Sequence, residues 1–80
     1  MTDKIIIMFH CGGKSIDVEI PSSITANELI HGLNVGFNLG IDESNESECF
    51  LRSENPLALI KGNIEISELG LRNGSSVYLR

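Results

Sequence analysis

The sequence is poor in basic residues, in cysteine and in long hydrophobic runs. Its 80 residues include six Lys and Arg against eleven Asp and Glu, so the formal net charge at pH 7 is −5. An excess of negative charge repels both the phosphate backbone of nucleic acids and anionic membrane surfaces. The charge therefore argues against a nucleic-acid partner.

The longest unbroken apolar run, Ile5 to Phe9, is too short for a membrane segment, because a bilayer span needs ~20 residues and a secretory signal ~7–15. We therefore expect a cytoplasmic protein without membrane insertion. The two cysteines are Cys11 and Cys49. A small secreted domain held by disulfides normally has more cysteines, so both are interpreted as free thiols.

What is present is the composition of one small globular domain. Apolar residues make up 41% of the chain and charged residues 21%, which is typical of a folded protein and not of a disordered one. The length leaves room for a single domain covering residues 1–80. We expect this domain to be a monomer or a weak oligomer.

Hydrophobic patterning predicts a hairpin at the start of the chain. Lys4 to Phe9 is rich in β-branched residues and is followed by a glycine-containing turn, His10 to Gly13. Strict alternation predicts a second strand from Ser15 to Ile20, which Pro21 ends. Later elements are expected at Cys49 to Ser53, Leu57 to Lys61, a single helical turn at Ser67 to Gly70, and Ser75 to Leu79.

One helix has a clear start signal. Thr25 and Glu28 form a capping box, and Ile24 and Leu29 occupy the two positions of a hydrophobic staple. We expect the helix to begin at Thr25 and to end by Gly40. An apolar stripe follows at spacings of three and four: Leu29, Ile30, Leu33 and Phe37.

The order of these elements is an α+β pattern, in which the helix buries its stripe on one face of a mixed sheet. It predicts a β-grasp of about five strands with one main helix. The last strand is then expected between the first and the third strand, parallel to the first. The predicted core is Ile5, Ile7, Ile16, Val18, Leu29, Leu33, Leu51, Leu69, Val77 and Leu79.

The closing stretch, Ile66 to Leu79, reads Ile-Ser-Glu-Leu-Gly-Leu-Arg-Asn-Gly-Ser-Ser-Val-Tyr-Leu. It resembles the last turn, loop and strand of ubiquitin. The chain as a whole is similar in length and element order to the YukD/EsaB family, the small bacterial ubiquitin-like proteins associated with type VII (WXG100) secretion systems. The pattern Ile-Ser-Glu-Leu-Gly-Leu-x-Asn-Gly is the specific part of this resemblance.

The resemblance implies a non-enzymatic binding module, a cytoplasmic accessory or regulatory component of a type VII secretion system. It also implies a protein partner from the secretion machinery and no cofactor. Ubiquitin and the sulfur carriers act through a flexible C-terminal Gly-Gly, and the sequence here reads Val77-Tyr78-Leu79-Arg80, so conjugation is not expected. The alternative is a sulfur-carrier or conjugated ubiquitin-like protein with an atypical C-terminus.

Two short motifs suggest chemistry that their surroundings do not support. Gly13-Lys14-Ser15 resembles the end of a phosphate-binding loop, but the first glycine of that motif falls on Met8 and a strand follows it. His10 and Cys11 suggest a Cys–His nucleophile, yet neighbours on an extended chain point to opposite faces. A hairpin turn in contact with solvent is the favoured interpretation of both.

Metal binding is disfavoured as well. His31 and Cys49, taken with the His-Cys pair near the first turn, lack the short paired spacings of a zinc site. Asp42 to Glu48 is rich in carboxylates but lacks the register of a calcium-binding loop. We interpret it as a solvated acidic loop and predict no metal or catalytic site.

The predicted partner-binding surface is the outer face of the sheet. Alternation along the first, third and last strands turns five side chains outward: Met8, Phe50, Arg52, Tyr78 and Arg80. In a β-grasp sheet, Met8, Tyr78 and Phe50 are expected to be neighbours. An apolar patch with arginines at its rim has the composition of a protein-binding surface.

Overall fold

A long hairpin begins the fold of the computed structural model, which describes residues 3–54 and 57–79. Strand β1 (Lys4–Cys11) pairs antiparallel with β2 (Lys14–Pro21). Gly12 and Gly13 join them with φ of 60° and 78°, the left-handed geometry of a tight turn whose twist matches the strands. The predicted turn from His10 to Gly13 is wrong at its start, because His10 and Cys11 belong to β1.

Helix α1 (Ala26–Phe37) follows the hairpin and confirms the capping-box prediction. The hydroxyl of Thr25 accepts a hydrogen bond from the N–H of Glu28 at 3.2 Å, and the Glu28 carboxylate accepts one from the N–H of Thr25 at 2.9 Å. The helix ends at Asn38, which has a left-handed φ of 53°. A short polar residue tolerates that conformation better than most and commonly ends helices.

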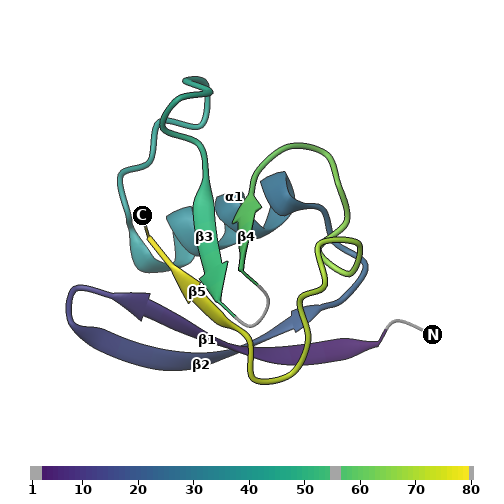
Figure 1. Ribbon diagram of the computed structural model, residues 1–80. Coiled ribbons are helices and arrows are strands. Elements are labelled where there is room, and N and C mark those ends of the chain that lie inside the picture. Colours follow the sequence, from purple (N-terminus) through teal and green to yellow (C-terminus); the bar gives the residue numbers. More distant parts are fainter. Residues whose placement is uncertain (1–2, 55–56, 80) are drawn as a thin grey trace.

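Three short strands complete the sheet, which confirms the predicted ubiquitin-like β-grasp. They are β3 (Leu51–Glu54), β4 (Ala58–Ile60) and β5 (Ser76–Tyr78). The strand order is β2-β1-β5-β3-β4, with β5 parallel to β1 and antiparallel to β3. Figure 1 shows α1 behind this sheet, so that one sheet face is covered by the helix.

The segment between β4 and β5 contains the predicted turn, but as part of a series of turns and not of a helix. Residues 66–70 form consecutive turns, in which the N–H of Leu69 donates to Ile66 at 3.1 Å and that of Gly70 to Ser67 at 3.1 Å. The turn predicted at Ser67 to Gly70 is therefore present as a hydrogen-bonded turn, and these residues are not part of a helix. Ile66 and Leu71 are buried at the two ends of these turns, so burial of their side chains holds the segment against the core.

The core lies between α1 and the sheet. Of the predicted core residues, five are buried and confirm the prediction: Ile7, Leu29, Leu33, Leu51 and Val77. Four are partly buried and pack against these: Ile5, Val18, Leu69 and Leu79. Ile16 is a wrong prediction, since 43% of its surface is exposed. It lies near the hairpin end, which extends past α1 (Figure 1).

Candidate functional site

The face of the sheet opposite α1 is not covered by the helix, so side chains on it are available for contact with other molecules. Phe9, Leu51 and Val77 are fully buried on the helix side. Since side chains alternate along a strand, their neighbours in sequence face the other way. His10 and Tyr78, paired across β1 and β5, therefore lie together on the outer face.

Three side chains from three adjacent strands stack on this face. The imidazole of His10 and the phenol ring of Tyr78 lie with centroids 4.4 Å apart and planes 14° apart. The guanidinium carbon of Arg52 lies 5.5 Å from the centroid of the same phenol ring. Arg52 is paired with Tyr78 across β3 and β5, so the register of the two ladders itself brings these groups together.

Glu54 adds a negative charge next to this stack. Its hydrogen bond with the Tyr78 hydroxyl is the main cause that raises the pKa of the phenol above its ordinary value, and its charge adds to the shift. Arg52 acts in the opposite direction, because a nearby positive charge favours the phenolate. The outer face therefore presents an aromatic ring between a cation and a carboxylate.

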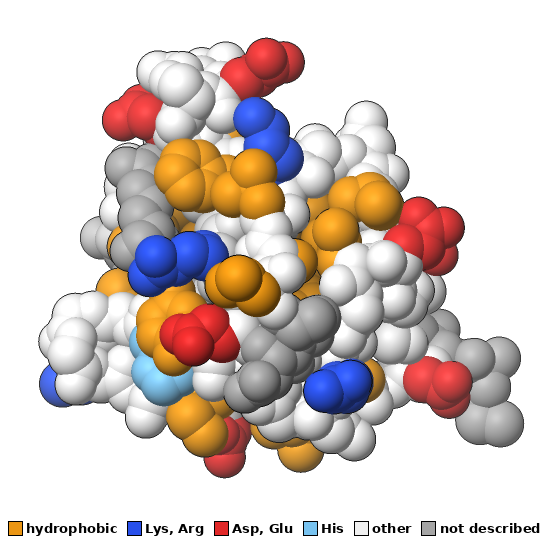
Figure 2. All heavy atoms as spheres, in the orientation of Figure 1, with side chains coloured by type: hydrophobic (Ala, Val, Ile, Leu, Met, Phe, Trp, Pro, Cys, Tyr) orange, Lys and Arg blue, Asp and Glu red, His pale blue; other side chains and the backbone are white. Residues whose placement is uncertain are grey.

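Apolar side chains surround the stack. Met8 is 37% exposed, and Ile6 and Leu59 are more exposed still. Leu59 is paired with Arg52 across β4 and β3, so it lies on the same face. Figure 2 shows this face, with hydrophobic side chains interrupted by basic and acidic groups and a histidine beside the hydrophobic atoms.

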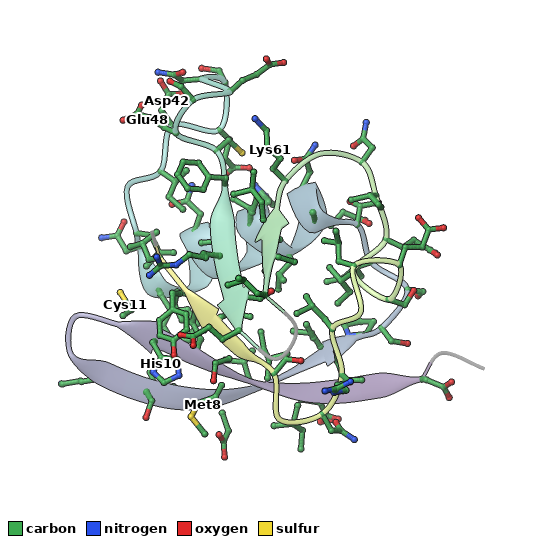
Figure 3. The ribbon with its side chains drawn as sticks, in the orientation of Figure 1. Met8, His10, Cys11, Asp42, Glu48 and Lys61 are labelled. Atoms are coloured by element: carbon green, nitrogen blue, oxygen red, sulfur yellow. The ribbon has the colours of Figure 1, made fainter. Side chains whose placement is uncertain are left out.

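A depression of about 370 Å³ lies at the hairpin end, next to the stack. Its walls include His10, Cys11, Lys14 and Tyr78, and Figure 3 shows Met8, His10 and Cys11 at this end of the molecule. The Nε2 atom of His10 is buried there and has no hydrogen-bond partner among the described residues. The imidazole ring packs against the phenol ring of Tyr78.

The five predicted binding residues do not all lie on the outer face in the described part of the chain. Met8, Arg52 and Tyr78 lie on the outer face as the alternation predicts, but Met8 is paired with Ser76, two residues before Tyr78 on β5. Phe50 is partly buried just before β3, and its N–H donates to the carbonyl of Glu48 at 3.0 Å. Arg80 lies outside the described residues.

His10 is the outer-face residue that the sequence reasoning missed. The sequence predicts that the first strand ends at Phe9, because glycines follow closely, and this prediction places His10 in the turn. The signal was present, since the alternation that places Lys4, Ile6 and Met8 outward continues to His10. The turn needs only Gly12 and Gly13 for its positive φ angles.

The acidic loop is a separate cluster at the other end of the molecule, where Figure 3 shows Asp42 and Glu48. Nδ1 of His31, on α1, lies 3.1 Å from the carboxylate of Glu43. Burial is the main cause that raises the pKa of the nearby Cys49 thiol, and the charge of Glu43 adds to it. Burial and the charge of Glu43 both favour the protonated thiol, which is a poorer nucleophile and metal ligand than the thiolate.

The part of the chain that the structure describes contains neither a metal centre nor a membrane-spanning helix. Residues 3–54 and 57–79 contain no group of three or more His, Cys, Asp or Glu side chains placed to hold a metal ion. None of the helical structure in these ranges has both the length and the apolar character that crossing a bilayer requires. Cys11 and Cys49 are free thiols.

Comparison with known proteins identifies the family. No curated protein is significantly similar to the chain. A family model described as "WXG100 protein secretion system (Wss), protein YukD" matches residues 5–79, which span all five strands and the helix. The fold, the closing pattern and this match agree, and the chain therefore belongs to the YukD family of ubiquitin-like proteins of the WXG100 secretion system.

Proposed function

We propose that this chain is a non-enzymatic, non-conjugating binding module of a type VII secretion system, and that it binds a protein component of that system through the outer face of its sheet. The family match supports the association with secretion. The stack of His10, Tyr78 and Arg52 supports the choice of surface.

The stack is the single observation that carries this choice. Tyr and Arg are the residue types that most often dominate protein–protein binding, because they bring large contact area together with a polar group. The phenol ring of Tyr78 is already held by His10 on one side and by Arg52. A side chain ordered before binding loses less conformational entropy when the partner arrives.

The exposed apolar residues extend the proposed surface. Met8 and Ile6 lie outward on β1, and Leu59 lies beyond Arg52 on β4. Phe50 and Arg80 complete it by sequence, because each is two residues from a member of the stack along its own segment. Arg52 gives this surface positive charge and favours a partner with an acidic patch of its own, and Arg80 is assigned to the basic rim by sequence alone.

The test is a binding titration against individually purified components of the WXG100 secretion system from the same organism. For the component that binds, Tyr78→Ala and Arg52→Ala should each weaken binding by about 2 kcal/mol, roughly 30-fold. Val35→Ala is the matched control, since Val35 is an exposed apolar residue on α1. Equal affinities for all four proteins would exclude the outer face as the docking surface.

The proposal places the module in the cytoplasm, where it would meet the cytoplasmic parts of the secretion machinery. Fractionation of cells that produce the chain at its native level tests this directly. Recovery with the cytoplasmic fraction, or with membranes only when the machinery is present, is expected. Recovery with membranes in cells that lack the machinery would contradict it.

A further inference from the structure

Strand β2 lies at a border of the sheet, and no described strand pairs with its outer edge. The N–H of Met8 donates to Ser75 at 2.9 Å, so the backbone polar groups of Met8 point toward β5 and away from β2. Asp17 lies opposite Met8. Met8 and Asp17 therefore form a non-hydrogen-bonded pair, in which the backbone N–H and C=O groups of the two residues point away from each other. The backbone N–H and C=O groups of Asp17, and those of the alternate residues Ser15 and Glu19, therefore face the open edge of β2.

An apolar groove of about 290 Å³ runs along this edge, between β2 and α1. Val18 and Ile20 line it from β2, and Leu29, Gly32 and Phe37 line it from α1. A methyl group placed on Gly32 would have no other heavy atom within 4 Å. The groove is therefore open at Gly32, and a side chain of another molecule has room to enter there.

The two sides of the edge differ in polarity: the groove is lined mainly by apolar side chains, with one carboxylate, Glu28, which accepts a hydrogen bond from the N–H of Thr25. Val18 and Ile20 point toward the groove, and the alternating residues Asp17 and Glu19 are exposed on the outer side of β2. A strand added to this edge would place every second side chain in the groove and the others beside the two carboxylates. Apolar residues fit the first set of positions, and Lys or Arg fit the second.

We infer that the open edge of β2 and the groove beneath it bind an extended segment of a partner protein as an added strand, with apolar and basic side chains in alternation. The backbone groups at the edge supply hydrogen bonds, the groove selects apolar side chains, and the carboxylates select basic ones. This inference does not depend on the outer-face proposal, because it uses different residues.

A second copy of the chain is a poorer occupant of the same edge. Pairing of β2 with another β2 would bring the row containing Asp17 and Glu19 next to the identical acidic row. Like charges on adjacent strands oppose pairing. The same acids that select a basic segment therefore discourage self-association.

The test uses the full chain, labelled for nuclear magnetic resonance, and a synthetic peptide of alternating Val and Lys as long as the eight residues of β2. Binding should slow the hydrogen exchange of the Asp17 and Glu19 amides, because their N–H groups gain acceptors. A peptide of the same composition, with its Val and Lys residues in two separate blocks, controls for charge alone and should bind at least about tenfold more weakly.

Two variants separate the groove from the charge. Gly32→Leu fills the groove and should fold at least as well, because Gly is a poor helix former; it should lower peptide affinity about tenfold or more. Asp17→Lys with Glu19→Lys should shift the preference to a peptide of alternating Val and Glu. Glu46→Lys, in the acidic loop, is the control for a change of charge away from the edge.

Three results would overturn the inference. They are unchanged exchange of the β2 amides when the peptide binds, equal binding of the alternating and block peptides, and undiminished binding to Gly32→Leu. Dimerisation that slows exchange of the same amides without any peptide would instead identify a second copy as the occupant. Tyr78→Ala should bind the peptide normally, so failure here is distinguishable from failure of the outer-face proposal.

Discussion

The side-chain Oδ1 of Asn73 accepts a hydrogen bond from the backbone N–H of Ile6 at 2.7 Å. The next residue, Gly74, donates its N–H to the carbonyl of Ile6 at 2.9 Å. These two contacts continue the pairing of β1 with β5 beyond the end of the β5 ladder. The Asn-Gly pair of the closing pattern therefore aligns β5 with β1 through these two hydrogen bonds.

We predict that Asn73→Ala lowers the free energy of unfolding by about 0.5–1.5 kcal/mol, because the Ile6 N–H loses its hydrogen bond to the Asn73 side chain. Urea unfolding followed by circular dichroism measures this change. Arg72→Ala alters the exposed residue just before Asn73 and should change the same free energy by less than about 0.5 kcal/mol. Equal losses of unfolding free energy in Asn73→Ala and Arg72→Ala would show that Asn73 acts only through the turn and not through its hydrogen bond to Ile6.

The fold was predictable because its signals are local. The capping box at Thr25 and the alternation in β2 are readable over a few residues, and each agrees with the structure. With one helix and about five strands, few arrangements bury the helix stripe, and the observed strand order is the β-grasp one. The closing pattern then pointed to the family.

The details of the site were less predictable because they depend on register and on tertiary contacts. Which residue stacks on Tyr78 is decided by the pairing of β1 with β5, and alternation alone does not choose between Met8 and His10. Ile16 has the same alternation as Val18, yet only the structure shows that the helix does not cover the hairpin end. The open groove beside β2 likewise arises from the placement of α1.

The contrast between two aliphatic residues tests the observed core. Leu33 is 3% exposed and Ile16 is 43% exposed. Leu33→Ala should lower the free energy of unfolding by about 2–5 kcal/mol, because it removes buried methyl groups and leaves a cavity. Ile16→Ala should cost less than about 1 kcal/mol. Urea unfolding of both variants checks the order, and a larger loss for Ile16→Ala would contradict the observed packing.

The hydrogen bond between Glu54 and Tyr78 should be visible in the titration of the phenol. Because the chain has one Tyr and no Trp, its near-ultraviolet absorbance reports the ionisation of Tyr78 alone. We expect a pKa above the ordinary 10.0, since the hydrogen bond and charge of Glu54 favour the protonated phenol. Glu54→Gln should lower this pKa, and Arg52→Ala should raise it further because Arg52 favours the phenolate.

The control for that titration is Glu19→Gln, which removes a carboxylate from the same face of the sheet but from β2. It should leave the pKa of Tyr78 close to that of the unsubstituted chain. Shifts of the same sign in Glu54→Gln and Arg52→Ala would contradict the observed arrangement, because the two groups act on the phenol in opposite directions.

Asn34 connects the acidic loop to α1. Its side-chain amide donates to the carbonyl of Ile41 and to the carboxylate of Glu43, each at 2.9 Å, and its Oδ1 accepts from the N–H of Ile41 at 3.0 Å. The hydrogen bond from Asn34 is the first cause that lowers the pKa of Glu43 below its ordinary 4.5, and the contact with His31 is the second. The folded state therefore favours the ionised carboxylate of Glu43.

Because the pKa of Glu43 is lowered in the folded state, the stability of the fold depends on pH. A carboxylate whose pKa is lower in the folded state stabilises the fold above its unfolded pKa, and the contribution is lost as the pH falls through the folded value. Stability should therefore decrease below about pH 4.5, and Glu43→Gln should make that decrease shallower, as judged by urea midpoints over a pH series.

The control is Glu46→Gln, which removes a carboxylate of the same loop that makes none of these contacts. Asp42, whose pKa is also lowered, is retained in both variants. The same acid slope in Glu43→Gln and in the unsubstituted chain would show that the connection between α1 and the loop does not depend on the charge of Glu43.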